Sequence, residues 1–277
     1  MNSLSASTQD LLRERYGSLD ALPPLRPTPV LDTLLAHRSV RAFSDQPVDD
    51  ETVHTLVAAG QSASTSSNLQ VWSVVAIRDP ERKARLSQLA KGQAHVANCP
   101  VLLLWLADLS RLETLGAQQN MPVEGTDFLE FFLMGSVDAA LAAQNAAIAA
   151  ESLGLGLTFI GGMRDHPAEV AAELGLPPKV FAVFGMTVGY PDPAKPASIK
   201  PRLPLQTVLH HEQYDASQLR EHVDQYNETM ETFYKKEGMT PRGNWERHSL
   251  KRASGPEALT GRDVLKSVLR KLGFPLR

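Results

Sequence analysis

The sequence is poor in several features that identify a function directly. Its 277 residues include one cysteine, Cys99, so an intrachain disulfide and a cysteine-cluster metal site are both excluded. The net charge of −3 leaves no basic surplus for a nucleic-acid partner. The adjacent His210 and His211 would point to opposite sides of a strand, so no metal site is predicted. What is left is an ordinary soluble globular composition, with 43% hydrophobic and 21% charged residues.

The common nucleotide-binding loops are also absent from the sequence. It has no G-x-G-x-x-G segment after a strand and no G-x-x-x-x-G-K-[ST] loop. It has no G-x-S-x-G elbow either, so Ser64–Ser67 is not expected to hold a hydrolase nucleophile. A phosphate-bearing ligand would therefore have to meet side chains rather than a glycine-rich loop.

Long apolar segments are missing as well. Residues 1–10 are polar and lack the apolar core of a signal peptide. The apolar runs, such as Val101–Ala107, are far too short to span a bilayer. We therefore expect a cytoplasmic protein with no membrane partner.

The elements that the sequence predicts mix helices and strands without the regular strand–helix spacing of a Rossmann fold. This favours the α+β class, with a mixed sheet between helices. The continuous apolar run Val101–Ala107 predicts a central strand covered on both faces. Further strands are expected at 72–77, 155–160 and 180–189, and helices at 3–16, 29–36, from about 50, 79–90, 127–153, 167–174, 216–236 and 257–272.

The prolines near the N-terminus suggest how the chain is divided. Those between residues 23 and 29 interrupt regular structure. We therefore expect residues 1–28 to form an N-terminal extension packed on a single domain, 29–277. The end of that domain, about 216–277, is expected to be a helical excursion.

The longest predicted helix, 127–153, is apolar or small almost all round. Its segment 139–150 holds eight alanines. Such a helix is buried, and small residues let another helix approach closely. The pattern fits either a subunit interface or an ordinary hydrophobic hub inside the domain.

The stretch His37–Arg41 is the first candidate for a ligand site. It packs two guanidinium groups, an imidazole and a hydroxyl into five residues. An arginine fork donates bidentately to a phosphate, and a serine adds a short hydrogen bond. If the preceding helix continued, Arg38 and Arg41 would share a face. The alternative is that both arginines form surface ion pairs.

Three other segments are candidates, each with an alternative. Gly161-Gly162 at a strand end can present bare backbone N–H groups to a flat ligand, or it forms only a tight turn. Lys200 and Arg202, in a proline-rich loop, are further candidates for a phosphate. A basic cluster in the C-terminal third is either a phosphate site or a solvated helix end: Lys235, Lys236, Arg242 and Arg247.

Together these segments resemble the nitroreductase family of FMN enzymes, and within it the oxygen-insensitive, NADPH-preferring nitroreductases and flavin reductases. The segments that carry the resemblance are His37–Arg41, Ser64–Gln70, Gly92–Val96, Gly135–Gly162 and Lys200–Pro204. The resemblance implies a three-layer α+β fold, in which helices flank a mixed central sheet, and an intertwined homodimer.

The resemblance also implies which residues bind FMN. His37, Arg38 and Ser39 would lie around the phosphate and ribityl chain, with Arg202 joining on the phosphate. Further contacts are expected near the pyrimidine (Arg41, Lys200), from the other subunit's loop (Ser64, Thr65, Ser66, Ser67, Gln70), at the ring edge (Gln93) and facing flavin N5 (Phe159, Ile160, Gly161, Gly162). Because FMN carries the chemistry, no catalytic side chain is expected.

The implied activity is ping-pong hydride transfer from NADPH through FMN to a nitroaromatic, a quinone or a free flavin. Two alternatives are an NADPH-flavin reductase that supplies reduced FMN and a non-catalytic flavin-binding protein. Lys236 and Arg242 are the candidates for binding the 2′-phosphate of NADPH. Glu237 lies near an expected arginine, so the preference for NADPH over NADH is expected to be moderate.

Overall fold

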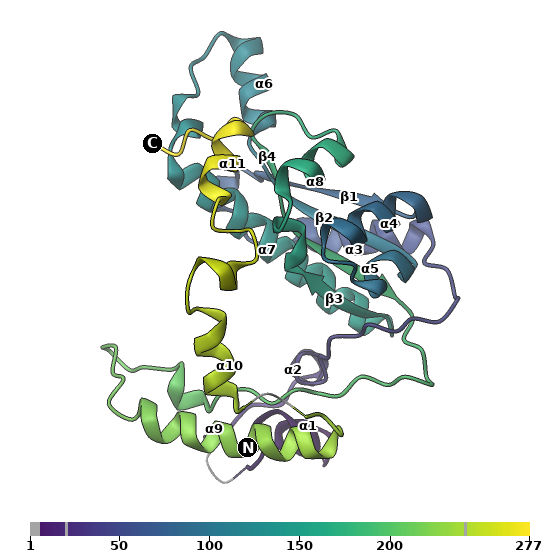
Figure 1. Ribbon diagram of the computed structural model, residues 1–277, viewed down its shortest axis with the longest axis vertical. Coiled ribbons are helices and arrows are strands. Elements are labelled where there is room, and N and C mark those ends of the chain that lie inside the picture. Colours follow the sequence, from purple (N-terminus) through teal and green to yellow (C-terminus); the bar gives the residue numbers. More distant parts are fainter. Residues whose placement is uncertain (1–5, 20–21, 241–242) are drawn as a thin grey trace. The chain divides into compact units, whose positions relative to one another are not determined.

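The computed structural model describes residues 6–19, 22–240 and 243–277 (Figure 1). The chain forms two compact units. The helical unit comprises residues 1–38 and 198–259, and the sheet unit comprises residues 39–197 and 260–277. The grouping of the N-terminal extension with residues 198–259 is a feature that the sequence did not predict. The division into an extension, 1–28, and a domain, 29–277, stays a prediction.

The sheet unit contains a four-stranded sheet in the order β1-β2-β4-β3. Its strands are β1 (Trp72–Ile77), β2 (Val101–Asp108), β3 (Gly156–Ile160) and β4 (Val180–Gly189). Each ladder between these strands is antiparallel. The α+β class is thus confirmed, but the predicted mixed sheet is wrong for the described strands. An isolated bridge between Ser39 and Leu157 supplies parallel pairing.

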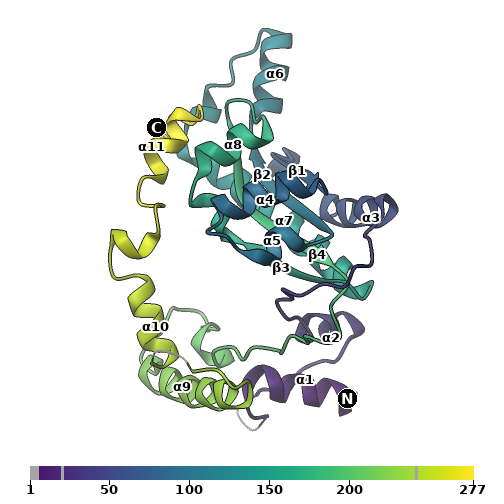
Figure 2. The same cartoon turned by 45° about the vertical axis from the view of Figure 1, so that its right-hand side comes forward.

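Helices cover both faces of this sheet, as Figure 2 shows for α4, α5 and α8 in front of it. The helices of the sheet unit are α3 (Asp50–Gln61), α4 (Pro80–Leu89), α5 (Ala94–Asn98), α6 (Ser110–Gln119), α7 (Leu129–Ser152), α8 (Pro167–Leu174) and α11 (Leu265–Lys271). Short 3-10 turns lie at Ser66–Asn68 (η1), Glu124–Asp127 (η2) and Gly161–Arg164 (η3).

The strand β2 is the centre of the core. All of its residues are buried, as the apolar run predicted. Leu103 and Trp105 pack in one cluster with α3 and α7, while Leu102 and Leu104 pack in another with α4, α5 and α8. Alternate side chains of one strand therefore join two helical layers to the sheet.

The alanine-rich helix α7 packs its small face inside the chain. Ala143 is fully buried in the cluster that α7 forms with α3 and β2. The reading of this helix as a hydrophobic hub is therefore correct for the alanines. A second face stays open: Leu133, Val137 and Leu141 are 55%, 46% and 42% exposed. They lie four residues apart, so they form one apolar stripe along the helix.

By length and composition alone, α7 is also apolar enough to cross a membrane. Its alanine face packs against α3 and the sheet, however, and its buried Asp138 accepts several hydrogen bonds. These contacts are those of a core helix.

The helical unit holds the remaining helices: α1 (Ala6–Tyr16), α2 (Pro29–Leu35), α9 (Leu219–Lys236), α10 (Trp245–Arg252), and the 3-10 turns η4 (Leu205–Thr207) and η5 (Pro256–Leu259). The single helix predicted over 257–272 is wrong, because η5 ends at Leu259 and α11 begins at Leu265. Between them Gly261 has a φ of +90°, a conformation that favours glycine and ends a helix. Residues 260–277 then rejoin the sheet unit, where Leu269 and Phe274 are buried.

Candidate functional site

The segment His37–Arg41 follows α2. Thr28 caps this helix by accepting a hydrogen bond from Leu31 N at 3.0 Å, and the helix ends at Leu35. The helix does not continue through Arg38 and Arg41, so the condition under which these two residues would share a helical face is not met. Both arginines are exposed, and each donates to a nearby main-chain carbonyl.

Contacts with β3 hold the part of this segment that belongs to the sheet unit. The Val40 amide donates to Leu157 O at 2.9 Å, and the Thr158 hydroxyl donates to Val40 O at 2.7 Å. Val40 is 4% exposed and lies against Gly156, where an added Cβ would come within 2.6 Å of it. Glycine at this position thus lets residues 39–41 lie directly along β3.

The Ser/Thr-rich loop is organised by a residue that the sequence analysis missed, Asp138. This carboxylate is 2% exposed and accepts hydrogen bonds from Thr65 Oγ1 at 2.5 Å, Ser66 N at 3.3 Å and Val71 N at 3.2 Å. The Thr65 hydroxyl in turn accepts from Gln70 N at 3.0 Å. Thr65 therefore holds the loop together, whereas the other predicted contacts, Ser64, Ser66, Ser67 and Gln70, are exposed.

The backbone of this loop is unusual. Ser67, Asn68 and Gln70 have φ values of 49°, 54° and 52°. Left-handed conformations at non-glycine residues cost free energy and persist where surrounding contacts enforce them. Because Asp138 supplies such contacts, the loop presents its hydroxyl and amide groups in a defined arrangement.

Two predicted site residues from distant segments come together at the end of β3. Gln93 precedes α5, and its Nε2 donates to Ala90 O at 2.8 Å. A Cβ on Gly162 would lie 2.8 Å from that same nitrogen. The absence of a side chain at Gly162 is thus what lets the Gln93 amide lie against the strand end. Phe159, earlier in β3, is 37% exposed, and its ring meets Phe184 edge to face.

Two guanidinium groups that the sequence analysis missed lie beside Gly161. Arg164 and Arg262 nitrogens would be 3.4 Å and 3.7 Å from a Cβ at this glycine. Arg164 donates to Val183 O, and burial followed by the Arg262 charge lowers the pKa of its guanidinium. Arg262 Nε is 2.6 Å from Oδ1 of Asp165, whose side chain is 3% exposed. Because Asp165 pairs with Arg262, the three charged side chains beside Gly161 carry one net positive charge.

In the helical unit, Lys200 and Arg202 lie on a segment fixed from both sides. Both side chains are exposed, whereas Pro201 between them is buried. The Tyr226 hydroxyl donates to Pro201 O at 2.9 Å, and the Arg202 amide donates to Arg15 O at 2.8 Å. The buried Arg15 is another residue that the sequence analysis missed, because nothing in its local spacing indicates a contact so distant along the chain.

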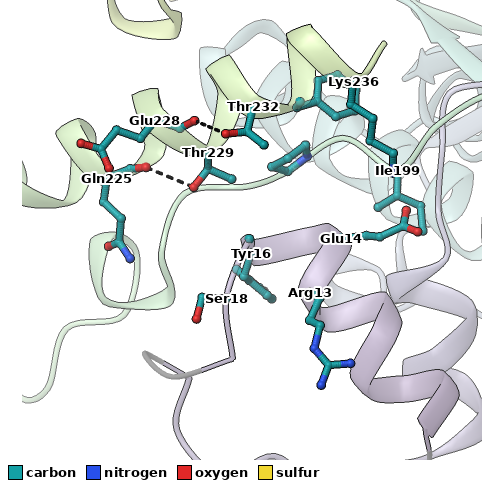
Figure 3. A pocket seen from close by; sticks show the side chains of 13 residues that line it. Arg13, Glu14, Tyr16, Ser18, Ile199, Gln225, Glu228, Thr229, Thr232 and Lys236 are labelled. Atoms are coloured by element: carbon teal, nitrogen blue, oxygen red, sulfur yellow. Dashed lines mark hydrogen bonds between the residues drawn. The ribbon is translucent and has the colours of Figure 1, made fainter.

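A cavity of about 460 Å³ lies between α1 and α9, within the helical unit (Figure 3). Tyr16 and Ser18 border it from one side, and Thr229 and Thr232 from the other. The dashed lines in Figure 3 are the bonds that these two threonines donate to Gln225 O and Glu228 O, both at 3.1 Å. Lys236, a predicted NADPH contact, lines this cavity. Its predicted partner, Arg242, lies outside the described residues.

Comparison with known proteins identifies the family. The model of the nitroreductase family matches residues 34–190, and that of the family's C-terminal domain matches residues 200–277. The chain belongs to the nitroreductase family. This confirms the resemblance drawn from the sequence and the nitroreductase-like fold.

The similar proteins include two that are named for the reduction of flavins. An NADPH-flavin oxidoreductase of Vibrio harveyi is 41% identical over 204 residues, covering 74% of this chain and 82% of that protein. An FMN reductase (NADPH) of Bacillus subtilis is 39% identical over 208 residues, covering 74% and 83% of the two chains. The structure of NfrA2 from B. megaterium matches with a TM-score of 0.84 and 34% identity, over 91% of this chain and 100% of the other.

Proposed function

We propose that this nitroreductase-family protein is an FMN-dependent NADPH oxidoreductase that reduces nitroaromatics, quinones or free flavins in a ping-pong reaction. The observation that carries the proposal is the meeting of Gln93 and Gly162 at the end of β3. These residues come from separate segments, and each was expected at the flavin. The relatives named as an NADPH-flavin oxidoreductase and an FMN reductase support the same activity.

The chemistry of the residues present fits a flavin. The absence of a side chain at Gly162 leaves room for the Gln93 amide, the proposed ring-edge donor, and the Arg164 and Arg262 guanidinium groups border Gly161. In the helical unit, the exposed Arg38 and Arg202 are cations of the kind that bind a phosphate. The proposed FMN contacts are His37, Arg38, Ser39, Arg41, Ser64, Thr65, Ser66, Ser67, Gln70, Gln93, Phe159, Ile160, Gly161, Gly162, Lys200 and Arg202.

The residues of this chain bind, orient and supply charge. When bound, FMN provides the hydride acceptor and donor that no amino-acid side chain can supply. By the resemblance, Arg41 and Lys200 would lie near the pyrimidine of bound FMN, where positive charge would favour its reduction. Gln93 would hold the ring edge. Because solvent can supply the protons, no side-chain acid or base is required.

The protein is also proposed to act as a homodimer in the cytoplasm. The support is the apolar stripe of Leu133, Val137 and Leu141 on α7, which is exposed in the single chain. A contiguous patch of exposed apolar side chains is typical of a surface that contacts another protein. The stripe also runs along the helix whose Asp138 holds the loop of residues 64–70.

Two experiments test the activity. Purified protein should release FMN on denaturation and should oxidise NADPH when a nitroaromatic is added. A protein that binds FMN yet does not oxidise NADPH with any acceptor would be the non-catalytic alternative. Faster turnover with free FMN than with nitroaromatics would favour the flavin reductase, the activity for which the Vibrio harveyi relative is named.

A further inference from the structure

Arg15, in the N-terminal extension, links the two segments that carry the predicted FMN phosphate contacts. Its guanidinium donates to Leu35 O, His37 O and Lys200 O, each at 2.7 Å. Its own carbonyl accepts from the Arg202 amide at 2.8 Å. All of these residues belong to the helical unit. One side chain thus joins the chain after α2 to the segment 200–202.

Arg15 is held in place by the way α1 docks on α2. Thr8, Leu12 and Arg15 are 0%, 1% and 5% exposed, and their spacing puts them on one face of α1. The Thr8 hydroxyl donates to Asp32 Oδ1 at 2.7 Å, which ties the start of α1 to α2.

The carbonyls that Arg15 binds are suited to a cation. Leu35 is the last residue of α2, and the final carbonyls of a helix lack intrahelical partners and carry partial negative charge. His37 O lies two residues further along, so the guanidinium fixes the direction in which the chain leaves the helix toward Arg38. A planar guanidinium can bond several carbonyls at once, which a lysine ammonium on a flexible stem does less rigidly.

We propose that Arg15 is a positioning residue for the FMN phosphate. It holds the segments of Arg38 and Arg202 in place for the phosphate, a role that rests on the function proposed above. The matched family model begins at residue 34, so this contact comes from a part of the chain outside the family's own pattern. The N-terminal extension is therefore part of the cofactor site's support.

The test compares FMN with riboflavin, which lacks the phosphate. Apoprotein is titrated with each flavin. The ratio of the Kd for riboflavin to the Kd for FMN reports the phosphate contribution. In Arg15→Ala we expect FMN affinity to fall about tenfold or more, and riboflavin affinity to fall less. The FMN affinity of Arg15→Lys should lie between those of the wild type and Arg15→Ala. Arg202→Ala, which removes a phosphate contact directly, provides the reference.

The matched control is Arg13→Ala. Arg13 lies on the same helix but is exposed and pairs with Asp10 at 2.8 Å. Its removal should leave the ratio unchanged. If Arg15→Ala does not fold, Tyr226→Phe tests the same support, because it removes only the bond to Pro201 O. A ratio of riboflavin Kd to FMN Kd that is smaller in Tyr226→Phe and in Arg15→Lys than in the wild type supports the proposal.

A folded Arg15→Ala protein that keeps the wild-type ratio overturns the role of Arg15, as does an equal loss for both flavins. If Arg202→Ala loses the preference for FMN while Arg15→Ala keeps it, the phosphate site stands and only the positioning role falls. A wild-type protein that does not bind FMN overturns the proposed function together with this role.

Discussion

The Thr65 hydroxyl donates to the Asp138 carboxylate across 2.5 Å, so a buried acid of α7 holds a loop predicted to touch flavin. The same carboxylate accepts the amides of Ser66 and Val71. The loop's arrangement therefore depends on a residue 67 or more positions away along the chain. Stability and cofactor binding are expected to be coupled at this point.

Asp138→Asn tests that coupling. An amide keeps the size of the carboxylate but loses its charge and one of its two acceptors. Hydrogen bonds to charged groups contribute about 1.5–3 kcal/mol, so the free energy of unfolding should fall by roughly that amount. Amide hydrogen exchange in residues 64–71 should become faster. The control is Glu130→Gln on the same helix, where the side chain is exposed and little change is expected.

The apolar stripe on α7 predicts the effect of a charge there. Leu141→Glu should leave the fold intact, because Leu141 is 42% exposed, but should shift the protein from dimer to monomer. Sedimentation velocity measures the change. Gln88→Glu adds the same charge on α4, on the other face of the sheet, and should not alter assembly. Dimers that persist unchanged in Leu141→Glu would place the interface elsewhere.

Ala143→Trp is expected to behave differently from Leu141→Glu. Ala143 is fully buried in the chain's own core, so a tryptophan there should overpack it and cost about 1–3 kcal/mol of folding stability. Thermal unfolding of the monomeric Leu141→Glu background separates this loss from any effect on assembly. An Ala143→Trp protein with wild-type stability in that background would contradict the packing described for α7.

A cluster around Lys179 predicts a dependence of stability on pH. Its Nζ bonds Glu113 and lies 2.8 Å from Asp127 Oδ1. Burial alone would raise the pKa of Glu113, but hydrogen bonds from Lys179 and Thr126 outweigh it and hold this pKa below 4.5. The hydrogen bond from Lys179 also holds the pKa of Asp127 below 3.8. Depressed carboxyl pKa values stabilise the fold above the unfolded values, and this stability is lost as pH falls through the folded ones.

The unfolding free energy should therefore decrease as the pH falls below about 4.5, the ordinary pKa of Glu113. Lys179→Met should flatten this part of the profile and lower stability at neutral pH by about 1–2 kcal/mol, since Glu113 is partly exposed. Urea unfolding at several pH values measures both effects. The exposed Lys195, changed to Met, is the control. If the free energy of unfolding of Lys179→Met falls as steeply with pH as that of the wild type, the cluster is not the source of the pH dependence.

Coenzyme preference is expected to depend on Lys236 and Arg242. A 2′-phosphate distinguishes NADPH from NADH, and we expect a preference of roughly tenfold in kcat/KM, or about 1.4 kcal/mol. Lys236→Ala and Arg242→Ala should raise KM for NADPH and leave NADH kinetics nearly unchanged. Lys235→Ala is the matched control, because Lys235 pairs with Glu231 at 2.8 Å. An equal loss of kcat/KM with NADPH and with NADH would show that these residues support the fold instead of binding the 2′-phosphate.

Local sequence patterns predicted the regular elements well. The ranges 72–77, 167–174 and 180–189 match β1, α8 and β4 as observed, because apolar runs and capping residues are local signals. Strand direction is not a local signal, so the antiparallel ladders were missed. The break in 257–272 was missed as well, since it depends on Gly261 and on the ion pair between Arg262 and Asp165.

In the candidate site, too, some residues were predicted from the sequence and others were not. Gln93 and Gly162 were chosen by resemblance, and the structure brings them together. Asp138, Arg15 and Arg262 were not chosen, because each acts through a partner distant in the sequence. Their roles follow from burial and hydrogen bonding, and neither can be read from spacing along the chain. The residues that support a site are thus harder to predict than those expected to touch the ligand.

An anaerobic titration with NADPH tests the central claim most directly. Protein loaded with about one FMN per chain should lose its flavin absorbance as NADPH is added, because the cofactor accepts the hydride. Subsequent addition of a nitroaromatic should restore the absorbance of the oxidised flavin. Flavin absorbance that NADPH leaves unchanged would contradict the assignment of this chain as an NADPH oxidoreductase.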